Sequence, residues 1–225
     1  MGSKNKLRRF KENETFENVI QPSREELISN SFQYKGRWRE LVFKNDRPII
    51  LELGCGKGEY TLALGKLRPE INHIGIDIKG ARFWRGAKTA LETGLDNVAF
   101  LRMQIELIAF AFDQEEIDEI WITFPDPQIK YKRTKHRMTN PEFLNLYQNI
   151  LKPEGIVHLK TDSEFMHGYT LGLLQGLGHE ILYSNHNVYK SDHTPELVCT
   201  VQTFYESQYL AKNKPITYLQ FKFKG

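Results

Sequence analysis

The sequence contains two groups of residues whose types and spacing suit chemistry, and the first is a glycine-rich stretch. It reads ELGCGKG from Glu52 to Gly58 and lies between a short apolar run and a segment with helical spacing. Glycines at such a junction let the backbone turn tightly and approach a ligand that faces the helix N-terminus. Asp77 ends the next apolar run, where a carboxylate can accept hydrogen bonds from both hydroxyl groups of a ribose. Together the two features predict a site for a cofactor that contains a nucleoside.

The spacing of the glycines in this stretch distinguishes between two classes of cofactor. A dinucleotide site usually reads G-x-G-x-x-G, whereas Gly54, Gly56 and Gly58 form G-x-G-x-G, with Glu52 two residues before the first glycine. A pyrophosphate favours the open helix terminus, and a cationic amino-acid group favours a nearby carboxylate such as Glu52. The E-x-G-x-G-x-G form resembles the motif of class I S-adenosylmethionine-dependent methyltransferases. A nicotinamide oxidoreductase and a fold without a ligand remain the alternatives.

The second group is a basic stretch, FPDPQIKYKRTKHRMT, from Phe124 to Thr139. Five of the eight residues from Lys130 to Arg137 are Lys or Arg, although the net charge of the whole chain is only +3. Another basic cluster precedes Glu12, the first acidic residue, and contains Lys4, Lys6, Arg8, Arg9 and Lys11. Two dense clusters in a nearly balanced chain predict a surface that binds a polyanion, with a merely solvated surface as the alternative.

Apolar runs and helical patterns alternate along the chain, which predicts a parallel sheet covered by helices on both faces. We expect residues 1–45 to form a basic arm and a short helix, and residues 46–225 to form one domain. Ligands bind beyond the carboxyl ends of parallel strands, so Asp126, just after the fourth strand, is expected to face the cofactor. The expected strands are residues 48–54, 72–78, 97–103, 119–124, 155–162, 179–185 and 216–223.

The composition excludes several other classes of protein. With 40% hydrophobic and 26% charged residues the chain is globular. Cys55 and Cys199 are too few for a disulfide framework and fit a reducing cytoplasm. No second cysteine or paired histidine stands at ligand spacing, so we expect no metal site, and Cys55 is expected to be a small residue in a tight loop. No apolar run approaches the roughly 20 residues of a membrane span, so we expect no membrane association.

The basic stretch resembles the signature of the tRNA (guanine-N7-)-methyltransferase family. The resemblance continues at Thr161 and Asp162 after the fifth strand, and at Thr203 and Glu206, which match the family's T-x-x-E motif. It covers the chain from Arg47 to the end in four ordered motifs. Within the basic stretch, the residues at the family spacing are Phe124, Asp126, Pro127, Lys130, Lys132, Lys135, Arg137 and Thr139.

The resemblance implies an α/β, Rossmann-like class I methyltransferase fold with a seven-stranded, mostly parallel sheet. It implies S-adenosyl-L-methionine as the cofactor, tRNA as the partner, and N7 of guanine 46 in the variable loop as the methyl acceptor. We expect a monomer or a homodimer. The implied cofactor-binding residues are Glu52, Gly54, Gly56, Asp77, Gln104 and Asp126. The implied substrate-binding residues are Lys130, Lys132, Arg133, Lys135, Arg137, Asp162, Thr203 and Glu206.

The implied reaction determines which catalytic groups we expect in the site. Guanine N7 carries a lone pair and no proton, so its methylation needs no general base. Aligning N7, methyl and sulfur can contribute roughly 7 to 11 kcal/mol. The methylated base is cationic, so Asp126, the expected catalytic residue, and Asp162 could stabilise it. The basic loop is expected to bind phosphates, and the N-terminal arm could do the same, becoming ordered only on binding.

Three positions depart from the family pattern. Gln128 stands where the family usually has Trp, which removes an aromatic surface and could alter base stacking or local packing. Asp77 stands where Glu is common, and Gln104 stands where Asp or Asn is frequent. The departures keep two alternatives open: a methyltransferase with another RNA or protein substrate, and a non-catalytic RNA-binding protein with the same fold.

Overall fold

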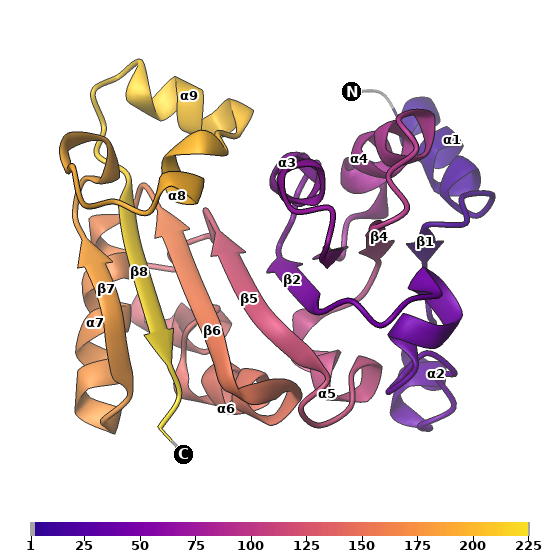
Figure 1. The fold of residues 1–225 in the computed structure, drawn as a ribbon, viewed down its shortest axis with the longest axis horizontal. Coiled ribbons are helices and arrows are strands. Elements are labelled where there is room, and N and C mark those ends of the chain that lie inside the picture. Colours follow the sequence, from indigo (N-terminus) through magenta and orange to yellow (C-terminus); the bar gives the residue numbers. More distant parts are fainter. Residues whose placement is uncertain (1–2, 225) are drawn as a thin grey trace.

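The computed structural model describes residues 3–224, which form one mixed sheet with helices around it (Figure 1). The strand order is β1-β4-β3-β2-β5-β6-β8-β7. Strands β1 to β6 run parallel to one another, and β8 is antiparallel to both β6 and β7. The expected α/β fold with a mostly parallel sheet is confirmed. The strands are β1 (Val19–Ile20), β2 (Ile49–Leu53), β3 (Asn72–Ile76), β4 (Val98–Leu101), β5 (Ile117–Thr123), β6 (Leu151–Thr161), β7 (Glu180–Asn185) and β8 (Thr217–Lys222).

The sheet has eight strands among the described residues, whereas the sequence predicts seven. All seven expected strands are present, and the additional one is β1, whose Val19 and Ile20 pair with Phe100 and Leu101 of β4. Two residues are too few to show an alternation of apolar and polar side chains, so the pattern gave no sign of this strand.

Helices cover both faces of the sheet. Leu51 of β2 joins the apolar core that packs against α6 and α7, whereas its neighbour Ile50 joins the core under α3 on the opposite face. Figure 1 shows α6 and α7 behind the sheet. The helices are α1 (Ser3–Asn13), α2 (Arg24–Ile28), η1 (Arg39–Phe43), α3 (Glu59–Leu67), α4 (Gly80–Glu92), η2 (Ile105–Leu107), α5 (Ile108–Ala111), η3 (Tyr131–His136), α6 (Pro141–Ile150), α7 (Glu164–Leu177), η4 (Val188–Lys190), α8 (Glu196–Thr200) and α9 (Phe204–Leu210).

The basic N-terminal stretch forms helix α1, which lies beside α4 (Figure 1). Asn13 Nδ2 donates a hydrogen bond to the carbonyl of Gly80 (2.9 Å), and Lys88 of α4 pairs with Glu12 (2.9 Å). The expectation that this arm becomes ordered only on binding RNA is wrong for the described residues 3–13, because contacts with α4 already hold them. The short helix expected after the arm is confirmed as α2, capped by the hydroxyl of Ser23.

Residues 188–214, where the sequence shows few clear periods, contain the short helices η4, α8 and α9. These helices lie above the carboxyl end of β6 and the amino end of the antiparallel β8 (Figure 1), and the carboxyl ends of the parallel strands are where ligands bind in α/β proteins. None of the helices in the described part of the chain is long and apolar enough to cross a membrane.

Candidate active site

The loop between β2 and α3 requires its glycines. Gly54, Gly56 and Gly58 have φ values of 75°, 57° and 75°, in the left-handed region that favours glycine. A Cβ atom at Gly58 would lie only 2.5 Å from the ring of Phe100, so a larger residue does not fit there. The backbone N–H of Gly54 donates to the carbonyl of Ile76 (2.8 Å), which holds the loop against the end of β3.

Glu52 joins two elements beneath this loop. Its side chain is 3% exposed and accepts hydrogen bonds from the backbone N–H (2.8 Å) and the hydroxyl of Thr61 in α3, and from the hydroxyl of Thr123 in β5 (2.6 Å). Burial raises the pKa of Glu52 to about 7, and the hydrogen bonds from Thr123 and Thr61 oppose the rise. A cationic ligand group beside Glu52 would favour its ionised form.

Asp77 lies just after β3 and is 8% exposed. Its Oδ2 accepts a hydrogen bond from the backbone N–H of Gly56 (3.0 Å), and its Oδ1 accepts one from the N–H of Lys79 (2.7 Å). Asp77, the residue predicted to bind the ribose, therefore also shapes the glycine-rich loop.

Two cavities share Gly54 in their walls. The first contains the buried carboxyl group of Glu52, and the second contains Asp77 and Gln104, whose Oε1 accepts a hydrogen bond from Arg24 (2.9 Å). An elongated ligand with a cationic amino-acid end and a nucleoside end matches this order of groups. The first, of about 130 Å³, is lined by Glu52, Gly54, Cys55, Gly56, Lys57, Glu59, Arg82, Thr123, Phe124, Thr203 and Tyr205. The second, of about 250 Å³, is lined by Gly54, Asp77, Ile78, Met103, Gln104, Ile105, Glu106, His136, Met138 and Phe143.

The turn after β5 has an unusual backbone. Phe124 has a φ of 47°, which costs a non-glycine residue about 1 to 3 kcal/mol and is typical of functional sites. Its N–H donates to the carbonyl of Lys160 in β6 (2.8 Å), which holds the turn in place. Asp126 is exposed on this turn and accepts a hydrogen bond from the N–H of Gln128 (3.1 Å). The walls of the two cavities include Phe124 but not Asp126, so the predicted catalytic residue lies two residues beyond the cavity wall.

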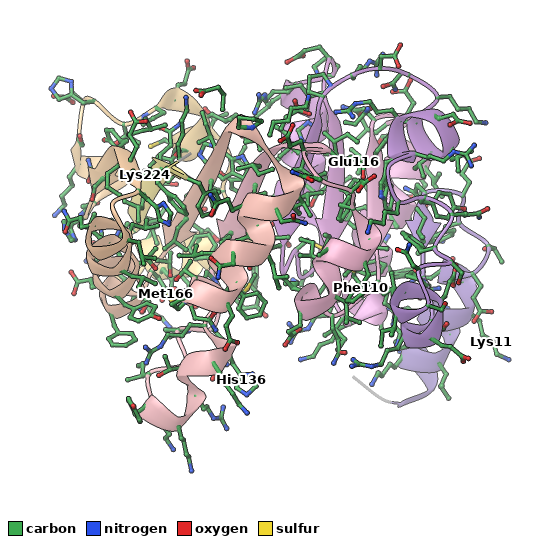
Figure 2. All side chains as sticks on the ribbon, turned by 90° about the horizontal axis from the view of Figure 1, so that it is seen from below. Lys11, Phe110, Glu116, His136, Met166 and Lys224 are labelled. Carbon is green, nitrogen blue, oxygen red and sulfur yellow. The ribbon has the colours of Figure 1, made fainter. Side chains whose placement is uncertain are left out.

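The basic loop, residues 130–137, projects from the body of the protein, as the position of His136 in Figure 2 shows. His136 and Met138 line the second cavity, so the end of the loop borders Asp77 and Gln104. Four of the predicted substrate-binding residues are exposed and make no ion pair with any residue that the structure describes: Lys130, Lys132, Arg133 and Lys135.

Arg137 differs from these four cations because it is only 6% exposed. Its Nε and Nη2 both donate to the carbonyl of Gln128 (3.2 Å), and Nη2 also lies 3.3 Å from the carbonyl of Ile129. The guanidinium lies over the rings of Phe165 and Tyr169, 4.9 and 4.5 Å from their centres. Arg137 is expected from the sequence to contact substrate, but the structure buries it as a brace for the basic loop.

The two residues of the T-x-x-E motif are structural partners. Thr203 and Glu206 form a capping box at the N-terminus of α9, in which each side chain accepts a hydrogen bond from the backbone N–H of the other. Glu206 is fully buried, pairs with Lys160 (2.7 Å) and accepts a hydrogen bond from the hydroxyl of Tyr189 (2.7 Å). Thr203 lines the first cavity, whereas Glu206 has no surface for the substrate contact that the sequence predicts.

Asp162 follows β6 and forms an ion pair with Lys214, with 17% of its side chain exposed. Ser163, not Asp162, caps α7 through its hydroxyl group. The carboxylate of Asp162 is thus half-buried at the same end of the sheet as the turn that carries Asp126.

Sequence reasoning missed several residues that shape the cavities. Thr61 and Thr123 hold Glu52, and Lys57, Arg82 and Tyr205 line the first cavity. Lys57 and Tyr205 stand at variable positions of the glycine-rich and T-x-x-E motifs, and Thr61, Thr123 and Arg82 belong to no motif. Lys160 did carry a signal, since a charged residue inside an apolar strand requires a buried partner.

Known proteins resemble this chain in sequence and in fold. Residues 46–219 match the family model Methyltransf_4, which describes methyltransferases. A tRNA (guanine-N(7)-)-methyltransferase of Christiangramia forsetii is 71% identical over 224 residues, which are 100% of each chain. A protein of the same name from Bacteroides thetaiotaomicron is 42% identical, over 97% of this chain and 86% of the relative.

Solved structures share the fold at low sequence identity. The 16S rRNA methyltransferase KamB has a TM-score of 0.64 and 12% identity, over 83% of this chain and 92% of that chain. An antibiotic-related methyltransferase has a TM-score of 0.61 and 17% identity, over 93% of this chain and 98% of that chain.

The fold and the carboxylates around the glycine-rich loop define a class I S-adenosylmethionine-dependent methyltransferase. The family model and the identity to full-length relatives narrow this class further. The chain belongs to the tRNA (guanine-N(7)-)-methyltransferase family.

Proposed function

We propose that this protein transfers the methyl group of S-adenosyl-L-methionine to N7 of guanine 46 in the variable loop of tRNA. One observation carries the proposal: His136 and Met138, at the end of the basic loop, line the same cavity as Asp77 and Gln104. An RNA held by the exposed cations of this loop would therefore lie next to the cofactor. The relatives named above, one of them 71% identical over the whole chain, support guanine N7 as the acceptor.

The residues around the two cavities suit the binding of S-adenosyl-L-methionine. Its amino-acid end would bind in the first cavity, where Glu52 favours a cationic group and Thr203 closes the wall. Its ribose and adenine would bind in the second cavity, beside Asp77 and Gln104. When bound, the cofactor supplies a methyl group on a sulfonium centre.

The protein's part in the reaction is alignment and charge. The lone pair of guanine N7 forms the new C–N bond as the C–S bond breaks, so no proton has to move and no metal is required. The base becomes cationic, and Asp126 and Asp162 follow the adjacent strands β5 and β6, where their carboxylates can stabilise that charge. The exposed position of Asp126 suits contact with a base that arrives from solvent.

The RNA would be bound through its phosphates and its shape. The four exposed cations of the basic loop give affinity with little sequence information. Lys6, Arg8 and Lys11 are also exposed, on a helix that is fixed against α4. A guanine engaged in the tRNA core has to be unstacked, at a cost of a few kcal/mol. We further propose that the protein acts in the cytoplasm as a monomer or a homodimer.

Two tRNA transcripts that differ only at position 46 test the proposal. With methyl-labelled S-adenosyl-L-methionine, the transcript with guanine at this position should be labelled and the transcript with adenine should not. Equal labelling of both would move the target to another guanine. Asp126→Asn should lower the rate with the first transcript and leave cofactor binding intact, since Asp126 lies outside both cavity walls.

A further inference from the structure

Tyr131, in the basic loop, presents its ring to solvent. It is 93% exposed, more than any other large apolar or aromatic side chain in the described part of the protein. Exposed apolar residues are common when they are single and surrounded by neutral surface. Tyr131 instead stands among the four exposed cations of the loop, and no acidic residue lies between Asp126 and Glu142.

The loop that carries Tyr131 is held in a defined shape. The hydroxyl of Thr134 donates to the carbonyl of Tyr131 (2.7 Å), and Asn140 Nδ2 donates to the carbonyl of Lys135 (2.8 Å). At the base of the loop, the buried guanidinium of Arg137 donates to the carbonyl of Gln128 (3.2 Å). The ring is therefore displayed by an internally bonded 3-10 turn.

Position 128, where the related family usually has Trp, does not supply an exposed aromatic ring in this protein. Gln128 has a φ of 47°, and its side chain is half-buried, with Oε1 fully buried and without a hydrogen-bond partner in the described structure. The side chain at this position thus points into the protein. Tyr131 is the one Phe, Tyr or Trp residue of the basic loop, and its ring faces solvent.

We propose that Tyr131 is a positioning residue that stacks on an unpaired base of the tRNA substrate, while the lysines and arginine around it neutralise the neighbouring phosphates. The proposal rests on the proposed function and adds a specific contact to it. The observed combination, an exposed ring within a row of cations, matches a single-stranded polynucleotide, which alternates planar apolar bases with negative charges. A protein partner with acidic side chains would use the cations and leave the ring without a planar partner.

The test compares four proteins: wild type, Tyr131→Ala, Tyr131→Leu and Tyr131→Phe. For each, the affinity for an unmodified tRNA transcript is measured at several salt concentrations, together with kcat and KM for methyl transfer. Leu177→Ala serves as a control, since Leu177 is also exposed (48%) but lies at the end of α7. Thermal unfolding checks the fold, which an almost fully exposed side chain should not affect.

Stacking makes three results necessary. Tyr131→Ala and Tyr131→Leu should weaken RNA binding by about 5- to 50-fold, whereas Tyr131→Phe, which keeps the ring, should stay within about twofold of wild type. The slope of log affinity against log salt should be the same in all four proteins, because no phosphate contact is lost. The rise in KM should exceed any change in kcat.

Other results would overturn the proposal. If Tyr131→Ala binds RNA as tightly as wild type, the ring is only solvated surface. If Tyr131→Phe is as weak as Tyr131→Ala, the hydroxyl group and not the ring makes the contact. In both cases wild-type protein still forms 7-methylguanosine, so the proposed function stands. If wild type forms none, the proposed function and the stacking role fail together.

Discussion

The ammonium group of Lys160 and the carboxylate of Glu206 lie 2.7 Å apart, and both side chains are fully buried. Lys160 belongs to β6 and also donates to the carbonyls of Val198 (2.6 Å) and Val201 (2.9 Å). Burial lowers the pKa of Lys160, and the charge of Glu206 opposes that change. Because Glu206 also caps α9 through Thr203, the pair fixes the C-terminal helices over the first cavity.

Removing one member of this pair should destabilise the protein strongly. Glu206→Gln leaves the buried ammonium without a counter-charge, and Lys160→Met leaves the buried carboxylate alone, so each should cost about 3 to 5 kcal/mol in urea unfolding. The double variant, with neutral groups at both positions, should lose less than the sum of the two. Both single variants should also bind the demethylated cofactor more weakly, because Thr203, which lines the first cavity, is no longer held in place. Unchanged stability in either single variant would show that the Lys160–Glu206 pair does not stabilise the fold.

Glu52 should make stability depend on pH in an unusual direction. Its pKa is raised from 4.5 to about 7, so the folded state holds the proton more tightly than the unfolded state does. The stability from this group is fully present below pH 4.5 and is lost, by about 3 kcal/mol, as the pH rises to 7. Glu52→Gln should flatten the profile in this window, as measured by urea unfolding at several pH values. A variant that keeps the wild-type slope would assign the effect to other groups.

The exposed cations of the basic loop should act through phosphates. Lys132→Ala combined with Arg133→Ala should weaken tRNA binding and reduce the salt slope by about 1 to 2 units, with cofactor binding unchanged. Lys66→Ala, which removes an exposed cation of α3 outside this loop, provides the matched control. An unaltered slope in the double variant would make the loop a solvated surface.

Arg137 should be needed for the shape of the loop and not for its charge. Arg137→Lys keeps the charge but cannot donate through a planar fork while stacking on Phe165 and Tyr169. We expect a loss of about 1 to 2 kcal/mol in stability and a clear drop in tRNA affinity. Arg133→Lys, at an exposed position, should change neither. Wild-type RNA binding by Arg137→Lys would contradict the bracing role.

The local features of the site could be predicted from the sequence. The glycines of the first loop, Asp77 after β3 and the exposed cations of the basic loop each follow from residue type and from their place after a strand. All seven long strands were predicted because their apolar runs and flanking turn residues are clear. The strand β1 was not predicted, because two residues are too few to show a periodic pattern. The docking of helix α1 was not predicted, because its partner, α4, is distant in sequence.

Contacts between distant segments could not be predicted. The T-x-x-E motif suggests a substrate contact at Glu206, but its carboxylate is buried against Lys160, 46 residues earlier in the chain. The sequence predicts that Arg137 is one more exposed cation of the loop, yet Phe165 and Tyr169 of α7 bury it. Thr61 and Thr123 become partners of Glu52 only when α3 and β5 are assembled.

The most direct test of the account is the identity of the methylated nucleoside. Purified protein is incubated with labelled S-adenosyl-L-methionine and bulk tRNA that lacks 7-methylguanosine, and the tRNA is digested to nucleosides for mass analysis. The proposed function predicts label in 7-methylguanosine alone. Label in a different nucleoside, or cofactor binding without any transfer to tRNA, would contradict it.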